Sequence, residues 1–177
     1  MNSVSPSFLF LGQAILVTIT FLSVHCILVK SDTNLIEQTC KNTPYYNYCV
    51  TYLESRPGSL GANPEGLGLI MVSIVKDKAT ETLNLIKQEL EKSPELKVPL
   101  SACSQNYRYG ILEADIPEAT EALEKGNPKF AEDGMNDCVN ETKSCEEGFH
   151  GKSSPVIPAN KAVQITSAIA AAIAHQL

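Results

Sequence analysis

Apolar residues recur at intervals of three and four along most of the chain, the spacing that places them on one face of an α-helix. One such stripe runs from residue 67 to residue 90 and a second from residue 100 to residue 114. A third, between residues 127 and 149, is thinner because Asp and Glu interrupt it, and the last, from residue 155 to 177, is rich in alanine. Four long segments with short connections predict an all-α, antiparallel up-down-up-down four-helix bundle.

A polar residue followed by proline recurs where these segments begin. The four pairs are Asn63-Pro64, Ser93-Pro94, Asn127-Pro128 and Ser154-Pro155. The polar side chain can accept a backbone N–H that the first turn leaves unpaired, and proline loses no intrahelical hydrogen bond there. We therefore expect a helix to begin at each pair. Pro117, inside the second segment, predicts a break or kink near Asp115, because its ring clashes with the preceding turn.

The first 30 residues differ from the rest of the chain. Residues 1–29 contain no Lys, Arg, Asp or Glu, and most of residues 8–29 are apolar. This pattern is typical of a secretory signal peptide, with cleavage expected between about residues 26 and 31. The apolar stretch is also long enough to cross a bilayer, so an uncleaved signal anchor is the alternative. Removal of the leader leaves residues 31–177, enough for one domain with one core.

Residues 31–60 form a separate predicted unit ahead of the bundle of residues 61–177. Cys40 and Cys49 flank Pro44, so two short helices can turn at the proline and be joined by a local disulfide. We expect a helical hairpin there, followed by a loop rich in glycine and proline. Four of the six tyrosines lie in this unit, where they can pack on the bundle, cap a dimer or contact a partner: Tyr45, Tyr46, Tyr48 and Tyr52.

Five of the six cysteines remain once the leader is removed. If Cys40 pairs with Cys49, then Cys138 and Cys145 stand on one predicted helix, with Cα atoms about 10 Å apart and beyond the reach of a disulfide. Either could reach Cys103 on the neighbouring helix, and we take Cys138 as the thiol left over. We expect it to be buried and inert, with an intermolecular disulfide as the alternative.

Composition and motifs narrow the possible functions. The chain carries 14 Lys plus Arg against 20 Asp plus Glu, a formal net charge of -6, without the basic cluster that nucleic-acid binding needs. It has no motif of a serine hydrolase, a phosphate-binding loop or a zinc protease. His25, His150 and His175 are far apart in the sequence, so we expect neither a metal site nor a cofactor. A binding protein is therefore expected, and the glycosylation sequon at Asn140 supports secretion.

Two cysteine-containing runs, taken with Cys103, point to a known family. They are Thr39-Cys40-Lys41-Asn42-Thr43-Pro44 followed by Cys49, and Cys145-Glu146-Glu147-Gly148-Phe149. In combination they resemble the plant invertase and pectin methylesterase inhibitor family, and the resemblance covers essentially all of residues 31–177. Residues 127–135, together with residues 116–119 and 121–123 before them, are similar to the invertase-inhibitor branch.

The resemblance implies two disulfides, Cys40–Cys49 and Cys103–Cys145. Cys138 falls outside both bridges, and the resemblance does not fix its state. The implied fold is the same four-helix bundle with a hairpin extension that the apolar pattern predicts.

The resemblance also implies a target-binding site. In the invertase-inhibitor branch a Pro-Lys-Phe motif enters the sucrose-binding cleft of acid invertase, which assigns target binding here to Pro128, Lys129 and Phe130. Glu132 and Asp133 are further candidates, because they flank Lys129 and their protonation could tune binding. By themselves, Pro128 and Lys129 fit an ordinary helix start, and Phe130 has the spacing of a core residue. The likeness along the whole chain favours the binding role.

The sequence therefore predicts a secreted inhibitor of acid invertase (β-fructofuranosidase), not an enzyme, that occludes the active site. The first alternative is a pectin methylesterase inhibitor, which by resemblance uses the side surface of the same bundle. The second is a secreted cell-wall binding or structural module that inhibits nothing. The expected location is the apoplast or cell wall, with the vacuole as an alternative, and no membrane association is expected after leader cleavage.

Overall fold

The computed structural model describes residues 35–177, so the predicted signal peptide lies outside the described residues. Residues 35–41 form a short helix, and no strand occurs within residues 35–177. The later elements are α2 (Tyr46–Glu54), α3 (Pro64–Lys92), the 3₁₀-helix η1 (Pro94–Leu96), α4 (Lys97–Gln105), the π-helix η2 (Asn106–Asp115), α5 (Ile116–Glu124), α6 (Pro128–Glu147) and α7 (Ile157–Ala174). The predicted all-α class is confirmed.

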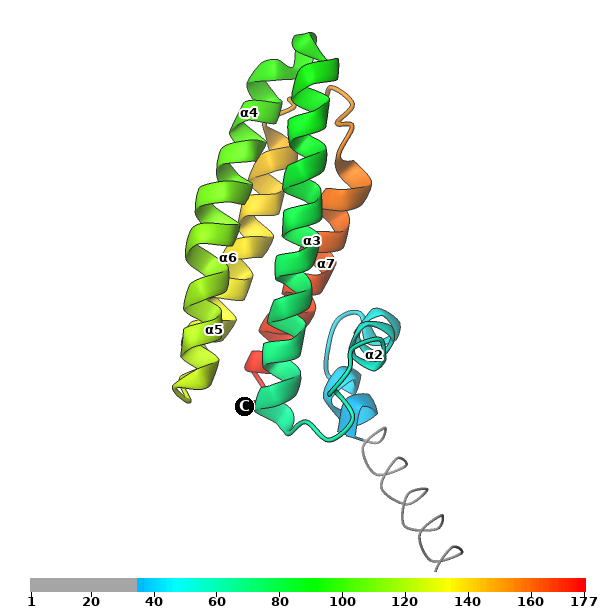
Figure 1. Ribbon diagram of the computed structural model, residues 1–177, viewed down its shortest axis with the longest axis vertical. Helices are drawn as coiled ribbons and strands as arrows, with labels where there is room; N and C mark the ends of the chain where they lie inside the picture. The colour runs from blue at the N-terminus through cyan, green and yellow to red at the C-terminus, as the bar shows by residue number, and fades with distance from the viewer. Residues whose placement is uncertain (1–34) are drawn as a thin grey trace, which may run out of the picture.

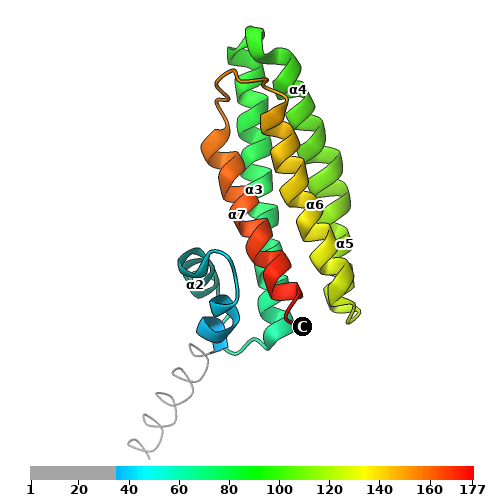
Figure 2. The same cartoon turned by 180° about the vertical axis from the view of Figure 1, so that it is seen from behind.

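Four long helical rods form an antiparallel bundle (Figure 1). The first is α3, the second is the continuous run α4–η2–α5, and α6 and α7 are the third and fourth. Each rod contacts the next, and α7 returns to contact α3, so the bundle closes. Seen from behind, α6 and α7 lie side by side along their length (Figure 2). The up-down-up-down topology is confirmed, and it places the α5–α6 turn and the end of α7 at the same end.

The core follows the apolar stripes of the sequence. The rod α3 buries one face through Leu67, Met71, Ile74 and Ile86. Burying a large aliphatic side chain contributes roughly 1.5–3 kcal/mol relative to leaving it exposed, so each of these residues adds to the stability of the bundle. Small residues let the rods approach: a Cβ added at Gly134 would stand 3.0 Å from a backbone carbonyl oxygen of the neighbouring rod.

Three of the four predicted helix starts hold, and one is wrong. Helical structure begins at Pro64, Pro94 and Pro128, but only Asn63 caps through its side chain, where Oδ1 accepts the Gly66 N–H at 2.8 Å. The last helix begins at Ile157 rather than at the Ser154-Pro155 pair. There the Ser154 hydroxyl accepts the N–H of Val156 at 3.3 Å and forms a turn, because Val156 is itself buried in the core.

The irregularity predicted near Asp115 lies at the expected place but is of another kind. The π-helix η2 ends at Asp115, and the helix continues through Pro117 without a break (Figure 1). Its last hydrogen bond runs from the N–H of Ile116 to the carbonyl of Ile111. The proline then lies in the first turn of α5, where a missing N–H is least costly.

The predicted hairpin packs beside one end of the bundle, where α2 contacts α3 and α7. Thr43 ends the first helix by donating its hydroxyl to the Cys40 carbonyl at 2.8 Å. The disulfide Cys40–Cys49 joins the two short helices, with Cα atoms 5.5 Å apart. The second predicted disulfide, Cys103–Cys145, joins α4 to α6 and is also present, with Cα atoms 4.6 Å apart. Both implied pairings are confirmed.

A buried hydrogen-bond network fixes the register between three rods. The Tyr107 hydroxyl donates to Oδ1 of Asn160 at 2.6 Å, and Nδ2 of Asn160 donates to the carbonyl of Thr142 at 2.9 Å. These residues belong to η2, α7 and α6. Burial raises the pKa of Tyr107, so the phenol stays neutral and continues to donate.

Cys138 is the free cysteine that the sequence predicts, and it is fully buried. Its thiol lies between the Asp115 carboxyl and the Ser167 hydroxyl, and burial raises its pKa, which keeps it protonated. Burial also raises the pKa of Asp115 to about 6, helped by the nearby charge of Asp137. One carboxyl oxygen of Asp115, Oδ2, is buried without a hydrogen-bond partner. The buried free thiol fits the expectation, whereas the raised pKa of the Asp115 carboxyl could not be foreseen.

Replacing Asp115 by Asn should flatten the pH dependence of stability. Because the pKa of this carboxyl is raised from 3.8 to about 6, the folded state binds a proton in that interval that the unfolded state does not. The free energy of unfolding should therefore fall as pH rises from about 4 to 6, by on the order of 1 kcal/mol after allowance for solvent screening at this partly exposed residue. Urea unfolding across this range measures the slope. Glu124→Gln, on an exposed site, should keep the wild-type slope, and an unchanged slope in Asp115→Asn would contradict the assignment.

Replacing Gly134 by Ala should destabilise the bundle although alanine favours helices. The new Cβ would meet the Asp115 carbonyl oxygen at 3.0 Å, and a backbone oxygen inside a packed rod has little room to move. A loss of about 1–3 kcal/mol is expected, as for other overpacked sites. Chemical denaturation provides the measurement. Gly148→Ala is the matched control, because its Cβ would meet only ordinary contacts, at 3.4 Å and beyond. Equal stability of the two variants would refute the close packing.

Candidate functional site

The α5–α6 turn presents the predicted Pro-Lys-Phe motif at one end of the bundle. Gly126 has a φ of 71°, a left-handed conformation that glycine adopts without strain. The N–H of Asn127 donates to the Ala122 carbonyl at 2.8 Å, which ends α5, and α6 begins at Pro128. The side chain of Asn127 makes no capping bond, so its expected capping role is wrong. The turn is held by backbone hydrogen bonds instead.

Lys129 and Phe130 both point outward from this turn. Phe130 is 59% exposed and the Lys129 side chain is 71% exposed, so neither side chain packs in the core. The alternative that Phe130 is a core residue is therefore wrong. Its ring borders a shallow hollow of about 180 Å³, together with Glu118 and Lys125. An exposed aromatic ring beside an exposed cation is a suitable surface for binding another protein.

The two acidic candidates hold the Lys129 ammonium in place. Nζ of Lys129 lies 2.7 Å from Oδ1 of Asp133 and 3.4 Å from Oε2 of Glu132. The hydrogen bond that Nζ of Lys129 donates to Asp133 is the main cause that raises the pKa of Lys129. The ammonium therefore stays charged at any physiological pH. Asp133 is well exposed, whereas the Glu132 side chain is only 20% exposed and lies closer to the neighbouring helix.

A residue that sequence reasoning missed completes this cluster. Nδ1 of His175, at the end of α7, lies 3.3 Å from Oε1 of Glu132. The hydrogen bond from His175 is the first cause that lowers the pKa of Glu132, and contact with Lys129 lowers it further. The two residues are 43 positions apart in the chain. The available clue was topological, since an up-down-up-down bundle brings the end of its fourth helix beside the start of its third.

A groove continues from this cluster between α6 and α7. Its volume is about 620 Å³, and one wall includes Glu132 and Asn136 of α6. The opposite wall is built by alanines and His175 of α7, and the hairpin closes one end with Asn42 and Pro44. The end of α7 is tied to the hairpin, because Nδ2 of Asn42 donates to Oε1 of Gln176 at 3.5 Å.

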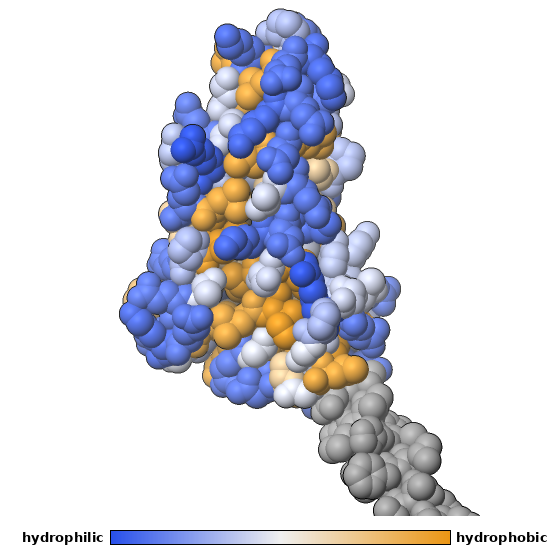
Figure 3. All heavy atoms as spheres, in the orientation of Figure 1, coloured by the Kyte–Doolittle hydropathy of each residue, from blue (hydrophilic) through white to orange (hydrophobic). Residues whose placement is uncertain are grey.

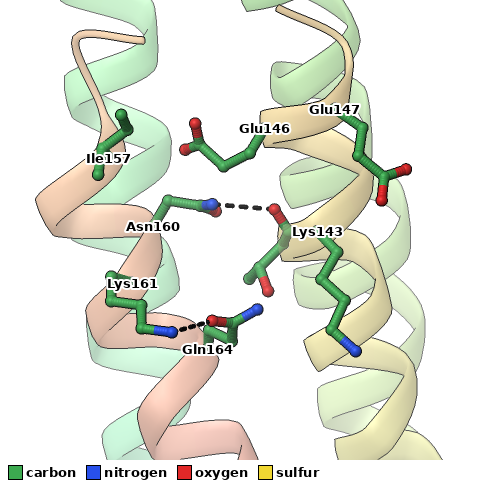
Figure 4. A pocket seen from close by; sticks show the side chains of 8 residues that line it. Lys143, Glu146, Glu147, Ile157, Asn160, Lys161 and Gln164 are labelled. Atoms are coloured by element: carbon green, nitrogen blue, oxygen red, sulfur yellow. Dashed lines mark hydrogen bonds between the residues drawn. The ribbon is translucent and has the colours of Figure 1, made fainter. Parts of the chain in front are cut away.

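A second groove lies between the opposite halves of α6 and α7. It has a volume of about 270 Å³, and Figure 4 shows its polar lining. Glu146 and Asn160 face across it, whereas Lys143 and Glu147 point away (Figure 4). Nζ of Lys161 donates to Oε1 of Gln164 at 2.6 Å, and the amide of Asn160 is used inside the bundle. Most polar side chains that line this groove therefore already form hydrogen bonds with other residues of the protein.

The hairpin tyrosines divide between packing and exposure. Tyr45 and Tyr52 pack against the core, whereas Tyr46 and Tyr48 are exposed. The Tyr48 and Tyr52 rings stack with centroids 6.3 Å apart. Packing on the bundle therefore accounts for two of the four.

The described residues offer neither a metal site nor a membrane-spanning helix. Within residues 35–177 no three His, Cys, Asp or Glu side chains are grouped so as to hold a metal ion. None of the helices in that part of the chain combines the length and apolar character needed to cross a membrane. Asn140, the predicted glycosylation site, is exposed on α6.

Known proteins match the chain over most of its length. Residues 34–173 match the profile of a family described as plant invertase/pectin methylesterase inhibitor. The cell wall/vacuolar inhibitor of fructosidase 1 of Arabidopsis thaliana is 46% identical over 143 residues, which cover 81% of this chain and 69% of that protein. The cell wall/vacuolar inhibitor of fructosidase 2 of the same plant is 43% identical over 97 residues, which cover 52% of this chain and 54% of that protein.

Solved structures agree on the fold. The crystal structure of a mutant form of a pectin methylesterase inhibitor from Arabidopsis superposes with a TM-score of 0.67 at 19% identity. The superposition covers 78% of this chain and 93% of that one. The sequence match and the shared bundle lead to one conclusion: the chain belongs to the plant invertase/pectin methylesterase inhibitor family.

Proposed function

We propose that this protein is a secreted inhibitor of acid invertase that occludes the active site with Pro128, Lys129 and Phe130. The observation that carries the proposal is the exposure of Lys129 and Phe130 at the start of α6, where core packing uses neither side chain. The relatives named inhibitors of fructosidase support the choice of target. Their names also support a location in the cell wall or the vacuole.

The chemistry of the target suits this surface. By the family resemblance the target, acid invertase, is a retaining glycosidase, and such an enzyme carries two carboxyl groups about 5–5.5 Å apart at the bond that it cleaves. Lys129 offers a permanent cation to those carboxyl groups, and Phe130 offers an apolar anchor beside it. Pro128 limits the backbone freedom of the helix start, so less entropy is lost on binding. Glu132 and Asp133 orient the ammonium, at distances of 3.4 and 2.7 Å, and the enzyme's carboxyl groups compete with them.

Inhibition of pectin methylesterase is the second candidate, because the family includes such inhibitors and one of them shares this fold. A side surface of the bundle would serve that function. Figure 3 shows apolar side chains along the seam between α3 and the α4–η2–α5 rod, with hydrophilic side chains on both sides. At 19% identity, the structural likeness supports the fold and does not choose the target.

Replacing Lys129 by Ala should abolish most inhibition of acid invertase. Truncating one partner of a desolvated charge pair costs about 2–5 kcal/mol, so the inhibition constant should rise about 30-fold or more. Titration of purified protein against sucrose hydrolysis measures the change. Lys125→Ala is the matched control, because Lys125 is exposed at the same end and pairs with Glu121 outside the motif. Equal inhibition by the two variants, with unchanged circular dichroism, would refute the role of Lys129.

The same preparation should leave pectin methylesterase active. An excess that blocks sucrose hydrolysis is expected to change ester hydrolysis by less than twofold, since the proposed contact is the exposed motif and not a side surface of the bundle. Titration with base of the acid groups released from methylated pectin supplies the measurement. Inhibition of the esterase alone would replace the proposal with its second candidate. Inhibition of neither enzyme would favour a cell-wall binding or structural module.

A further inference from the structure

The single Asn-x-Ser/Thr sequon of the chain lies inside a packed helix rather than in a loop. Asn140, Glu141 and Thr142 all belong to α6. Asn140 is exposed to solvent, whereas Thr142 is completely buried. Side chains two positions apart on a helix do not face each other, so the acceptor amide and the threonine hydroxyl point to different sides. A sequon that is glycosylated normally stands on a surface loop, and this one does not.

The neighbouring rods hold the sequon from two sides. On the side of η2, Nδ2 of Asn106 donates to the carbonyl of Glu141 at 3.3 Å. On the side of α7, Nδ2 of Asn160 donates to the carbonyl of Thr142 at 2.9 Å. The Thr142 hydroxyl itself donates to the Val139 carbonyl at 2.7 Å. The hydroxyl that defines the sequon is therefore both covered and already hydrogen-bonded in the folded protein.

A sugar-transferring enzyme cannot read this sequon while α6 is packed. It has to contact the Asn140 amide and the Thr142 hydroxyl together, which needs a local turn such as the one that asparagine forms with the residue two positions on. Forming that turn breaks the helix and exposes Thr142. The Cys103–Cys145 disulfide, three residues beyond Thr142, holds this part of α6 against α4. Access therefore requires partial unfolding of a bundle that the disulfide keeps closed.

The order of synthesis leaves time for sugar transfer before this packing forms. Asn160, which binds the Thr142 carbonyl, follows Asn140 by 20 residues in the chain. At the usual rate of synthesis those residues take about 1–4 s to be added. During that interval α7 is not yet complete, so the bundle cannot close over the sequon.

We propose that Asn140 carries an N-linked oligosaccharide and that the sugar is attached before α6 packs into the bundle. The donor is an oligosaccharide on a lipid diphosphate, to which the expected secretory leader brings the growing chain. The amide nitrogen of Asn140 attacks C1 of the first sugar. The N–C1 bond forms, the bond from C1 to the diphosphate oxygen breaks, and the amide gives up one proton to the released lipid diphosphate.

The attached sugar would stand on the exposed side of α6. Asn140 follows Lys129 by 11 residues, which places the two side chains on the same side of the helix about 16 Å apart along its axis. It also lies between the groove lined by Asn136 and the groove lined by Lys143. The sugar would therefore cover a side face of the bundle and leave the first turn of α6 accessible.

The first test measures the sugar on protein secreted by plant cells that express the full chain. Trypsin releases residues 130–143, and mass spectrometry before and after enzymatic removal of N-linked sugar gives the occupancy of Asn140. Wild type should carry an oligosaccharide on this peptide, whereas Asn140→Gln and Thr142→Val should carry none. Valine has the shape of threonine without its hydroxyl. An unmodified wild-type peptide would overturn the assignment, and invertase inhibition does not enter this measurement.

The second test determines when the sugar is attached. The full chain is purified from the bacterial periplasm, where disulfides form, and is then given an oligosaccharyltransferase with its lipid diphosphate donor. Reduced and unfolded protein should accept sugar at Asn140 about tenfold faster or more than folded protein, because the folded chain presents the sequon only in a small open fraction. Equal rates in the two states would overturn the proposed order.

A matched control combines Asn140→Gln with Gly151→Asn, which creates a sequon ending at Ser153 in the exposed loop after α6. Gly151 has a φ of 82°, a conformation that asparagine tolerates better than most residues. This control should accept sugar at similar rates in the folded and the reduced state. A folded control that is as unreactive as folded wild type would attribute the block to the enzyme rather than to α6, and would likewise overturn the proposed order.

Discussion

The close packing of α6 on the rods beside it is the constraint on which the rest of the structure depends. Gly134 brings α6 against the backbone of η2, and Cys103–Cys145 fixes its other end to α4. The buried hydrogen bond between Tyr107 and Asn160 then fixes the position of α7 along its axis relative to η2. With α6 fixed along its length, its first turn can protrude at the end of the bundle without loss of order.

The protruding turn exposes the side chains of the proposed binding site without a loss of core packing. A helix start needs little from its first side chains, because proline and backbone hydrogen bonds already define it. Lys129 and Phe130 can therefore be exposed at small cost to stability, since neither contributes to the core. Asp133 and Glu132 pair with Lys129, and the lysine side chain nevertheless stays largely exposed.

The disulfide of the hairpin stabilises the proposed site without touching it. Cys40–Cys49 holds the hairpin, whose Asn42 contacts the end of α7. The end of α7 in turn carries His175 to Glu132. The hairpin thus supports the proposed site indirectly, because it contacts the end of α7 that carries His175.

Periodicity, proline pairs and cysteine spacing were enough to predict the bundle, the hairpin and the helix start at Pro128. These features depend on local geometry, because a 3.6-residue period and a helix start are properties of neighbouring residues. The start of α7 was misplaced by two residues, since Val156 is drawn into the core. The π-helix before Pro117 was likewise invisible in the sequence, because its turns are set by packing on α6.

The sequence by itself determined the helical bundle and the helix start at Pro128, and it predicts that Pro128, Lys129 and Phe130 bind a target together with their acidic neighbours. Only the tertiary structure decided that Phe130 is exposed and that Asn127 does not cap. It alone placed His175 beside Glu132 and raised the pKa of Asp115. The reason is physical: burial and the contact of distant residues arise when helices pack, and neither is encoded in the spacing of neighbours along the chain.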